Sequence, residues 1–423
     1  MGWMPRKLAA ALGPSYVRVS GTWANSTYFH DSDDAPPATP PPGFGGVLTR
    51  AQWRGVIAFS RAVNAQIVTS FAISDGVRGA DGVWTPKEAL KVVNFTKANG
   101  GSIAAAEMFN EPSFASMGGA PKGYDAKAYG RDFVVFRDFA KKTLPKMVIL
   151  GPGSLGEAAP MAGVVTARMM LKSEDMLAAS GRGVDAFSYH FYGTVSKRCA
   201  GTQSAENALS DEWLMRTVRD EAFYAALRDR FEPGRPMWLT ETGETACGGN
   251  PWASTFVDTF RYLNQLGVLA KKGVQVVTHN TLAASDYGVI DEETLTPRPN
   301  YWSAVLWHRL MGTTVLDAGA AAPGVYLYAH CLRDQPGGVA VLAITTDRNE
   351  RRLVAIGSPI LYRLTSNDLM GRVIALNGRE LETGAGGTLP EMKGEQSPWG
   401  ELTLAPLSIT FLVFPNAGND SCW

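Results

Sequence analysis

The 423-residue chain carries 40 Lys and Arg against 40 Asp and Glu, which leaves no formal net charge at neutral pH. This balance gives no indication of a nucleic acid or an anionic membrane as a partner. It does not exclude a polyanionic substrate, because only the local field of a cleft matters for that. Hydrophobic residues make up 45% of the chain, and no apolar run approaches the roughly 20 residues of a membrane span.

Strand-like and helix-like segments alternate over residues 1–312, as a parallel (β/α)8 barrel requires. Such a barrel takes about 250 residues and leaves about 100 for a second domain. The first 12 residues predict a short helix, since they lack the long apolar core and cleavage site of a secretory signal. The predicted strands are 16–20, 66–73, 103–109, 147–152, 184–189 and 236–243, the predicted helices are 49–64, 86–98, 129–144 and 164–180, and 21–46 predicts a long loop over the barrel top.

Two of these strands end on a glutamate. An uncharged run from Ile103 leads through Glu107 into Asn110-Glu111-Pro112, and Pro112 cannot continue a strand. The apolar strand that starts at Pro236 leads into Glu241. Since chemistry in such a barrel sits at the carboxyl ends of the strands, we expect both glutamates in one site.

A single glutamate at a strand end is more often an exposed acid or a structural ion pair, but a pair of them indicates a specific chemistry. Retaining glycosidases need one carboxylic acid that protonates the leaving oxygen and one carboxylate, about 5 Å away, that attacks the anomeric carbon. Glu111 and Glu241 fit these requirements. Asn110 adds an amide donor for the sugar 2-hydroxyl.

These motifs resemble the large clan of retaining (β/α)8 glycosidases, in which the acid/base follows strand four and the nucleophile follows strand seven. The resemblance implies that Glu111 is the acid/base and Glu241 the nucleophile, with no metal or organic cofactor. A narrower resemblance, to the heparanase and β-glucuronidase family, covers residues 12–422. It rests on the segments 276–280, 286–291, 295–302 and 310–316 (VVTHN, DYGVID, LTPRPNYW and LMGTTVL).

Counting back from Glu111 at the end of strand four makes residues 16–20 strand two, so strand one is missing. Because an open barrel would leave two unpaired edges, we expect that the chain begins downstream of its native start. The alternatives are a first strand on a separate polypeptide and a rearranged N-terminus.

The family resemblance also implies substrate contacts. Asn25 falls where relatives commonly carry an Asp that contacts the terminal uronic acid, although an Asn can equally be a turn residue here. Tyr192, rather than Tyr189, would hold its hydroxyl against the nucleophile with His190 beside it, unless this aromatic rim only packs.

Four further residues complete the predicted site. By resemblance, the backbone of Gly248 and Gly249 and the hydroxyl of Tyr287 would grip the C6 carboxylate of the substrate, and Asn280 would be a further substrate contact. Taken alone, Gly-Gly is a turn.

Residues 313–423 change character, because strand-like runs recur there with Gly, Pro and Asn turns between them. They predict an antiparallel β-sandwich domain. Cys331 and Cys422 match positions that relatives bridge. Cys199 and Cys247 lie in neighbouring loops, so the even count predicts two disulfides and an oxidising compartment rather than a metal site, which would need short Cys/His spacing.

The sequence therefore predicts a retaining β-glucuronidase of heparanase type, a secreted or periplasmic monomer that acts on a glucuronic-acid-containing polysaccharide resembling heparan sulfate. One alternative is an exo-acting enzyme on small or oligosaccharide glucuronides. Another, of a different class, is a catalytically silent glycan-binding relative.

Overall fold

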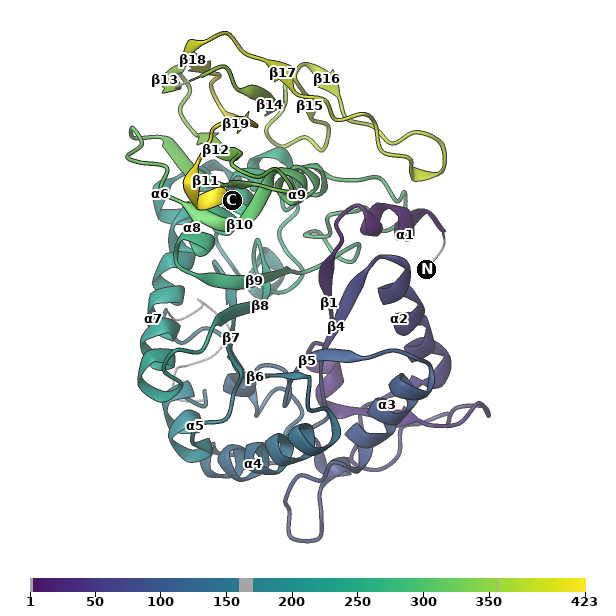
Figure 1. Cartoon of the computed structure of the whole chain (residues 1–423). Coiled ribbons are helices and arrows are strands. Elements are labelled where there is room, and N and C mark those ends of the chain that lie inside the picture. Colours follow the sequence, from purple (N-terminus) through teal and green to yellow (C-terminus); the bar gives the residue numbers. More distant parts are fainter. Residues whose placement is uncertain (1–2, 160–169, 356) are drawn as a thin grey trace.

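A computed structural model describes residues 3–159, 170–355 and 357–423. Seven parallel strands form the first sheet, and its two edge strands lie within contact distance of each other, so the sheet is a nearly closed barrel (Figure 1). In sheet order, the strands are β1 (Ser15–Val19), β4 (Ala65–Ser70), β5 (Ile103–Glu107), β6 (Val148–Ser154), β7 (Ala186–Tyr192), β8 (Met237–Gly243) and β9 (Val274–His279).

Helices surround this ring of strands in Figure 1 and follow the predicted alternation. The predicted helix 164–180 lies partly outside the described residues, and its described part contains α5. The helices are α1 (Trp3–Ala10), α2 (Arg50–Ala62), α3 (Lys87–Ala98), α4 (Ala126–Thr143), α5 (Ser173–Ser180), α6 (Asp211–Leu214), α7 (Arg216–Phe231), α8 (Phe256–Lys271) and α9 (Pro299–Leu310). The start of α2 shows how local sequence sets these bounds, because Thr49 and Gln52 form a reciprocal capping box there.

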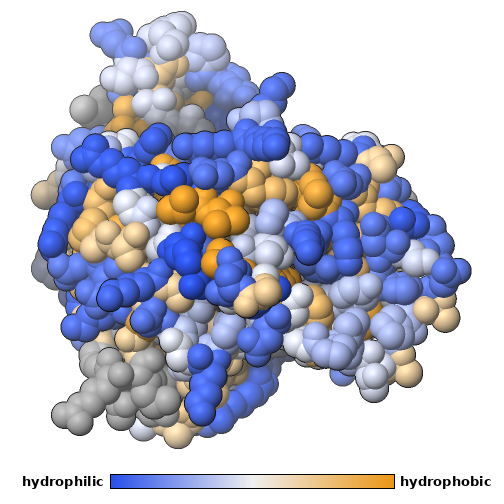
Figure 2. Space-filling model, turned by 90° about the horizontal axis from the view of Figure 1, so that it is seen from below, coloured by the Kyte–Doolittle hydropathy of each residue, from blue (hydrophilic) through white to orange (hydrophobic). Residues whose placement is uncertain are grey.

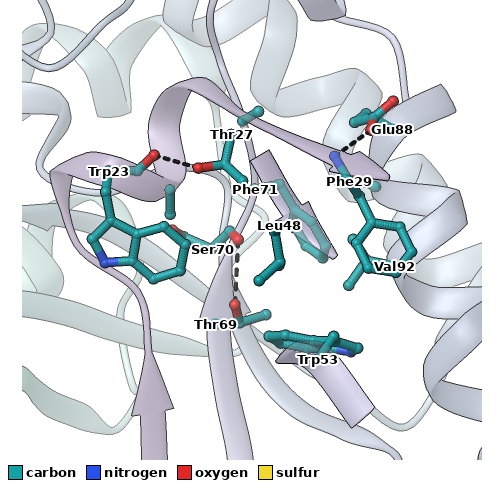
Figure 3. Close-up of a pocket in the computed structure, with 13 residues that line it drawn as sticks. Trp23, Thr27, Phe29, Leu48, Trp53, Thr69, Ser70, Phe71, Glu88 and Val92 are labelled. Atoms are coloured by element: carbon teal, nitrogen blue, oxygen red, sulfur yellow. Dashed lines mark hydrogen bonds between the residues drawn. The ribbon is translucent and has the colours of Figure 1, made fainter. Parts of the chain in front are cut away.

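The predicted loop 21–46 is more ordered than its composition suggests. It contains a short 3₁₀ helix, η1 (Thr22–Ser26), and the strand β2 (Thr27–His30), which pairs in parallel with β3 (Gly46–Thr49). A small cavity of about 40 Å³ lies beneath this pair, lined by Trp23, Phe29 and Trp53 among others (Figure 3). Tertiary packing of Phe29 against α2 and α3 stabilises strands that the Pro-rich stretch alone does not predict.

The predicted antiparallel sandwich is confirmed. An eight-stranded sheet faces the pair β13 (Arg351–Ala355) and β18 (Gly400–Leu404), with Leu402 and Leu412 buried between them and Leu353 partly buried beside them. In sheet order, the larger sheet holds β10 (Met311–Leu316), β11 (Val325–Leu332), β12 (Val339–Thr345), β19 (Ser408–Phe414), β14 (Ile360–Thr365), β15 (Ala375–Leu376) and β16 (Arg379–Glu380), while β17 (Glu395–Gln396) pairs with β14.

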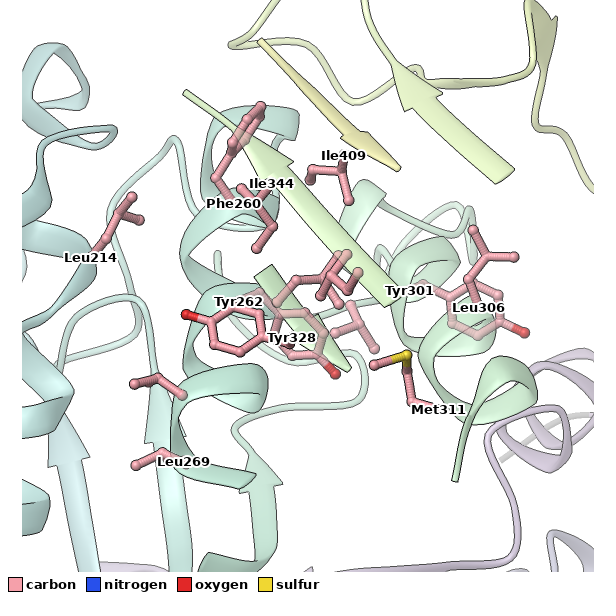
Figure 4. Packing of buried hydrophobic residues seen from close by; sticks show 14 of the residues in the cluster. Leu214, Phe260, Tyr262, Leu269, Tyr301, Leu306, Met311, Tyr328, Ile344 and Ile409 are labelled. Atoms are coloured by element: carbon pink, nitrogen blue, oxygen red, sulfur yellow. The ribbon is translucent and has the colours of Figure 1, made fainter. Parts of the chain in front are cut away.

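The barrel and the larger antiparallel sheet share one buried core. Side chains from α8 and α9, among them Phe260 and Leu306, pack in the same cluster as Tyr328, Ile344 and Ile409 of the sheet (Figure 4). The face of the molecule in Figure 2 is mostly hydrophilic, with hydrophobic residues gathered near its centre. No helix in the described ranges is long and apolar enough to cross a bilayer.

Glycine 267 marks the closest approach of α8 to the antiparallel sheet. A Cβ atom there would lie 2.3 Å from ring atoms of Tyr328, whose hydroxyl donates to Oδ1 of Asn264 at 2.7 Å. We expect Gly267→Ala to lower the free energy of unfolding by about 1–3 kcal/mol. The exposed Gly55 in α2 has nothing within 4 Å, so Gly55→Ala is expected to raise it by about 1 kcal/mol through helix propensity. Urea denaturation of both variants measures the difference, and a stabilised Gly267→Ala protein would contradict this packing.

Candidate active site

The structure brings Glu111 and Glu241 together at the carboxyl ends of β5 and β8. Oxygens of the two carboxylates and a ring nitrogen of His190 all lie within 4.8 Å of one another. Both glutamates keep about a sixth of their side chains exposed, at 17% and 15%. Glu111 has left-handed backbone angles, φ 49 and ψ 63, and Pro112 starts the 3₁₀ helix η3 (Pro112–Phe114) directly after it. The strand therefore ends at Glu107, before the predicted end at residue 109, and the chain turns sharply at Glu111.

Arg18, which the sequence did not indicate, lies between these groups. It comes from β1, and only 7% of its side chain is exposed. Its Nη1 donates to Oε2 of Glu241 at 2.6 Å, while its Nη2 donates to Glu107 at 2.9 Å and to Oδ1 of Asn110 at 2.8 Å. One guanidinium thus links strands β1 and β8 with the end of β5.

Glu107 is the second unpredicted member of the site. It is fully buried at the last position of β5. Burial raises the pKa of this carboxyl, but the charge of Arg18 and hydrogen bonds outweigh that effect and hold the pKa well below its usual range. The sequence did contain a signal for this pair, because Arg18 and Glu107 are the charged residues on the otherwise uncharged strands β1 and β5. Buried charges require partners, so the two residues could have been predicted to interact.

His190 lies opposite Glu241 in the β7–β8 register. Its Nδ1 is 3.1 Å from Oε1 of Glu111, and its Nε2 is 3.3 Å from Nη2 of Arg18 and 3.7 Å from Glu107. Burial and Arg18 oppose the charged ring, but the three surrounding carboxylates prevail and raise the pKa of His190 to about 9.

A chain of hydroxyl and amide groups leads outward from Glu241. Tyr192 donates its hydroxyl to Oε1 of Glu241 at 2.8 Å. Nδ2 of Asn280 donates to the Tyr192 hydroxyl at 2.8 Å and to the Tyr287 hydroxyl at 3.2 Å. Burial raises the pKa of Glu241, but His190, Arg18 and the bond from Tyr192 outweigh it and lower the pKa below its ordinary value. Tyr189 was the less favoured candidate for this contact, and its ring packs against Tyr224 instead.

The predicted glycine pair lies beside Tyr287. Gly249 has φ 80, and a Cβ atom there would meet the Tyr287 ring at 3.0 Å, so only glycine fits. The backbone carbonyl of Gly248 accepts from the N–H of Asp286, the residue before Tyr287, at 3.0 Å. The predicted disulfide between Cys199 and Cys247 is confirmed and joins this loop to the loop after β7, and the second predicted pair, Cys331 with Cys422, is bridged as well.

Asn25 is placed differently from the other predicted contacts. Its side chain is fully buried. Its Nδ2 donates to the carbonyl of Asn110 at 2.9 Å, and its Oδ1 accepts from the backbone N–H of Asn110 at 2.8 Å. Both polar atoms are therefore committed to bracing the Asn110-Glu111 backbone, and the structure does not bring this side chain to the cleft.

Glu111, His190 and Glu241 are also close enough to one another to hold a metal ion. The guanidinium of Arg18 already places a positive charge 2.6 Å from Glu241. This charge opposes a second cation at the same carboxylate.

Comparison with known proteins matches the family model "Glycosyl hydrolase family 79, N-terminal domain" to residues 43–267. Heparanase-like protein 1 of Arabidopsis thaliana is 26% identical over 98% of this chain and 84% of its own length. Baicalin-β-D-glucuronidase of Scutellaria baicalensis is 32% identical over 50% of this chain and 43% of its own length. Heparanase of Bos taurus is 26% identical over 83% of this chain and 66% of its own length.

Solved structures share the fold. A 4-O-α-L-rhamnosyl-β-D-glucuronidase from Fusarium oxysporum superimposes with a TM-score of 0.67 at 16% identity, covering 97% of this chain and 91% of that one. An α-L-arabinofuranosidase from Thermotoga maritima also gives 0.67, at 13% identity, over 97% and 89% of the two chains. The family match spans more than half of the sequence, so this chain belongs to glycosyl hydrolase family 79.

Proposed function

We propose that the protein is a retaining β-glucuronidase of heparanase type, which hydrolyses β-D-glucuronosyl linkages by double displacement. The approach of the Glu111 and Glu241 oxygens to within 4.8 Å carries this proposal. Inverting enzymes hold their carboxyl groups about 6.5–9.5 Å apart to leave room for a water molecule, whereas retaining enzymes hold them about 5–5.5 Å apart.

In the first step, a carboxylate oxygen of Glu241 attacks the anomeric carbon while Glu111 gives its proton to the departing glycosidic oxygen. In the second step, Glu111 takes a proton from water, the water oxygen attacks the same carbon, and Glu241 leaves. The donors from Arg18 and Tyr192 keep Glu241 ionised and oriented for the attack. Since Arg18 binds Oδ1 of Asn110, the Nδ2 group of that amide is directed to the sugar 2-hydroxyl.

Hydrogen-bond accounting at Tyr287 supports a negatively charged substrate. Its oxygen accepts from Nδ2 of Asn280 at 3.2 Å, so its own O–H can donate to a substrate anion. Burial raises the pKa of Tyr287 to about 12, so the proton stays on the oxygen. Such a group beside Gly248 and Gly249 suits the C6 carboxylate of a glucuronic acid.

The polymer is proposed to be heparan-sulfate-like, and the two disulfides support a secreted or periplasmic protein. A second candidate is exo action on small glucuronides, favoured by the 32% identity to baicalin-β-D-glucuronidase over half of the chain. A relative named inactive heparanase-2 is 24% identical over 83% of this chain, but the presence of Glu111 and Glu241 at one site argues against a catalytically silent protein here. Assays of intact heparan sulfate beside 4-nitrophenyl β-glucuronide separate these three functions.

Substitution of the two carboxylates is expected to separate their roles. Glu241→Gln should abolish turnover, because no nucleophile remains. Glu111→Gln should still form the glycosyl-enzyme from 4-nitrophenyl β-glucuronide, since nitrophenolate leaves without protonation, and should release the sugar slowly. Rapid-mixing kinetics would show this as a burst of nitrophenolate. Near-normal steady-state turnover in either variant would refute the assignment.

Replacing Tyr287 with Phe tests the selection for charge. The variant loses one charge-assisted donor worth roughly 1.5–3 kcal/mol, so kcat/KM on the glucuronide should fall about tenfold to a hundredfold. The matched 4-nitrophenyl β-glucoside lacks the carboxylate and should lose much less.

Tyr328→Phe is the control for this comparison, because it removes a buried hydroxyl between α8 and β11, remote from the cleft. It should leave the ratio of the two rates unchanged. Equal losses on both substrates in Tyr287→Phe would mean that this ring only packs the cleft, and a wild-type preference for the glucoside would overturn the substrate class.

A further inference from the structure

Glu107 is fully buried at the end of β5, and three other strands supply hydrogen bonds to it. Its Oε2 accepts from Arg18 of β1 at 2.9 Å. Its Oε1 accepts from the hydroxyls of Ser188 in β7 at 2.9 Å and Thr240 in β8 at 2.6 Å. A Cβ atom on Gly153 of β6 would lie 2.8 Å from the same oxygen. The carboxylate is therefore held from four sides.

We propose that Glu107 is a positioning residue for the glycosidase reaction: it is the buried counter-ion that fixes Arg18 and keeps Glu241 from becoming the only carboxylate bound to that guanidinium. This inference rests on the proposed function, because it assigns a role in activating Glu241 as the nucleophile. Glu107 itself never contacts the reacting atoms.

The division of donors on Arg18 is the first argument. Its Nη1 donates to Glu241, whereas its Nη2 donates to Glu107 and Asn110. With only 7% of its side chain exposed, the cation has little access to water. A buried cation left with a single anion pairs tightly with it, because the interaction is weakly screened. Glu241 would then be more strongly stabilised as a ground-state carboxylate and would attack more slowly.

The negative charge of Glu107 is the second argument. Glu107 shares the Arg18 guanidinium with Glu241 and repels the negative charge there, which keeps the pKa of the nucleophile from falling further. A neutral amide at position 107 would fill the same space and lose this repulsion. The titratable and charged groups that face Glu107 and Glu241 are Arg18 from β1, Glu111 after β5, Tyr129 from α4, His190 and Tyr192 from β7, and Tyr287 after β9.

The test is the pH dependence of kcat/KM for Glu107→Gln on 4-nitrophenyl β-glucuronide. The acidic limb reports the ionisation of the nucleophile in the free enzyme. Because the substitution lowers the pKa of Glu241, this limb should move to lower pH by about one unit. On the plateau, kcat should fall on the order of tenfold to a hundredfold. A residue that only supports the fold would lower the rate without moving the limb, and that result would overturn the proposal.

Two matched variants isolate the charge. Glu107→Asp keeps the charge but shortens the side chain, and Ser188→Ala removes one neutral donor to Oε1. Whatever their rates, both should keep the acidic limb at its wild-type position. A limb that shifts equally in Ser188→Ala would show that packing, not charge, sets the pKa of Glu241, and would also overturn the proposal.

A stability measurement covers the case in which Glu107→Gln does not fold. Arg18→Met alone leaves the fully buried Glu107 carboxylate without its cation, whereas the double variant Arg18→Met with Glu107→Gln replaces that carboxylate with a neutral amide. The double variant should therefore unfold at a higher temperature than Arg18→Met alone. A lower or equal Tm would refute the pairing. Wild-type protein inactive on every glycoside would instead refute the proposed function, and the comparison of Tm values would still stand.

Discussion

The buried guanidinium of Arg18 is the interaction on which the site depends. It is nearly inaccessible to water, so its charge must be matched inside the protein, and the matching carboxylates are Glu107 and Glu241. These residues come from β1, β5 and β8, which are far apart in sequence. The ion pairs exist only when the sheet curls so that the carboxyl ends of these strands face one another. Barrel closure and site assembly are therefore the same event.

Around this centre, loops carry the glycine pair and Tyr287 of the proposed carboxylate site. The segment after β8 holds Gly248 and Gly249, and the disulfide from Cys247 to Cys199 ties it to the neighbouring loop. In η1, both polar atoms of the Asn25 side-chain amide hydrogen-bond to the backbone of Asn110. The strands therefore position the charged side chains. The loops, which are held by a disulfide and by hydrogen bonds, position the polar groups.

The sequence was sufficient for the barrel and the sandwich, because each leaves a local signal: apolar runs that end in Pro or Glu, and short strands between turns. The even number of cysteines indicated two disulfides, and the pairing of Cys331 with Cys422 came from the family resemblance. The sequence was not sufficient for Arg18 and Glu107. Their importance lies in a pairing between distant strands, which no local pattern expresses. For Asn25, the sequence predicted a role that the structure does not support. Its position along the chain suggested a substrate contact, but its side chain is buried and bonds to the backbone of Asn110. The strands β2 and β3 arise from packing against α2 and α3, which a Pro-rich composition conceals.

One chain of hydrogen bonds connects the two tasks of the proposed enzyme. Asn280 donates to Tyr192, which holds Glu241, and to Tyr287, which faces the proposed carboxylate site. When a substrate anion accepts a hydrogen bond from the Tyr287 hydroxyl, the Tyr287 oxygen becomes richer in electrons and attracts the Asn280 amide more strongly. The hydrogen bond from Asn280 to Tyr192 then weakens, and the Tyr192 hydroxyl becomes a weaker donor to Glu241. A bound substrate carboxylate would in this way weaken the hydrogen bond that holds Glu241. Recognition of the charge would then favour attack on the anomeric carbon as well as binding.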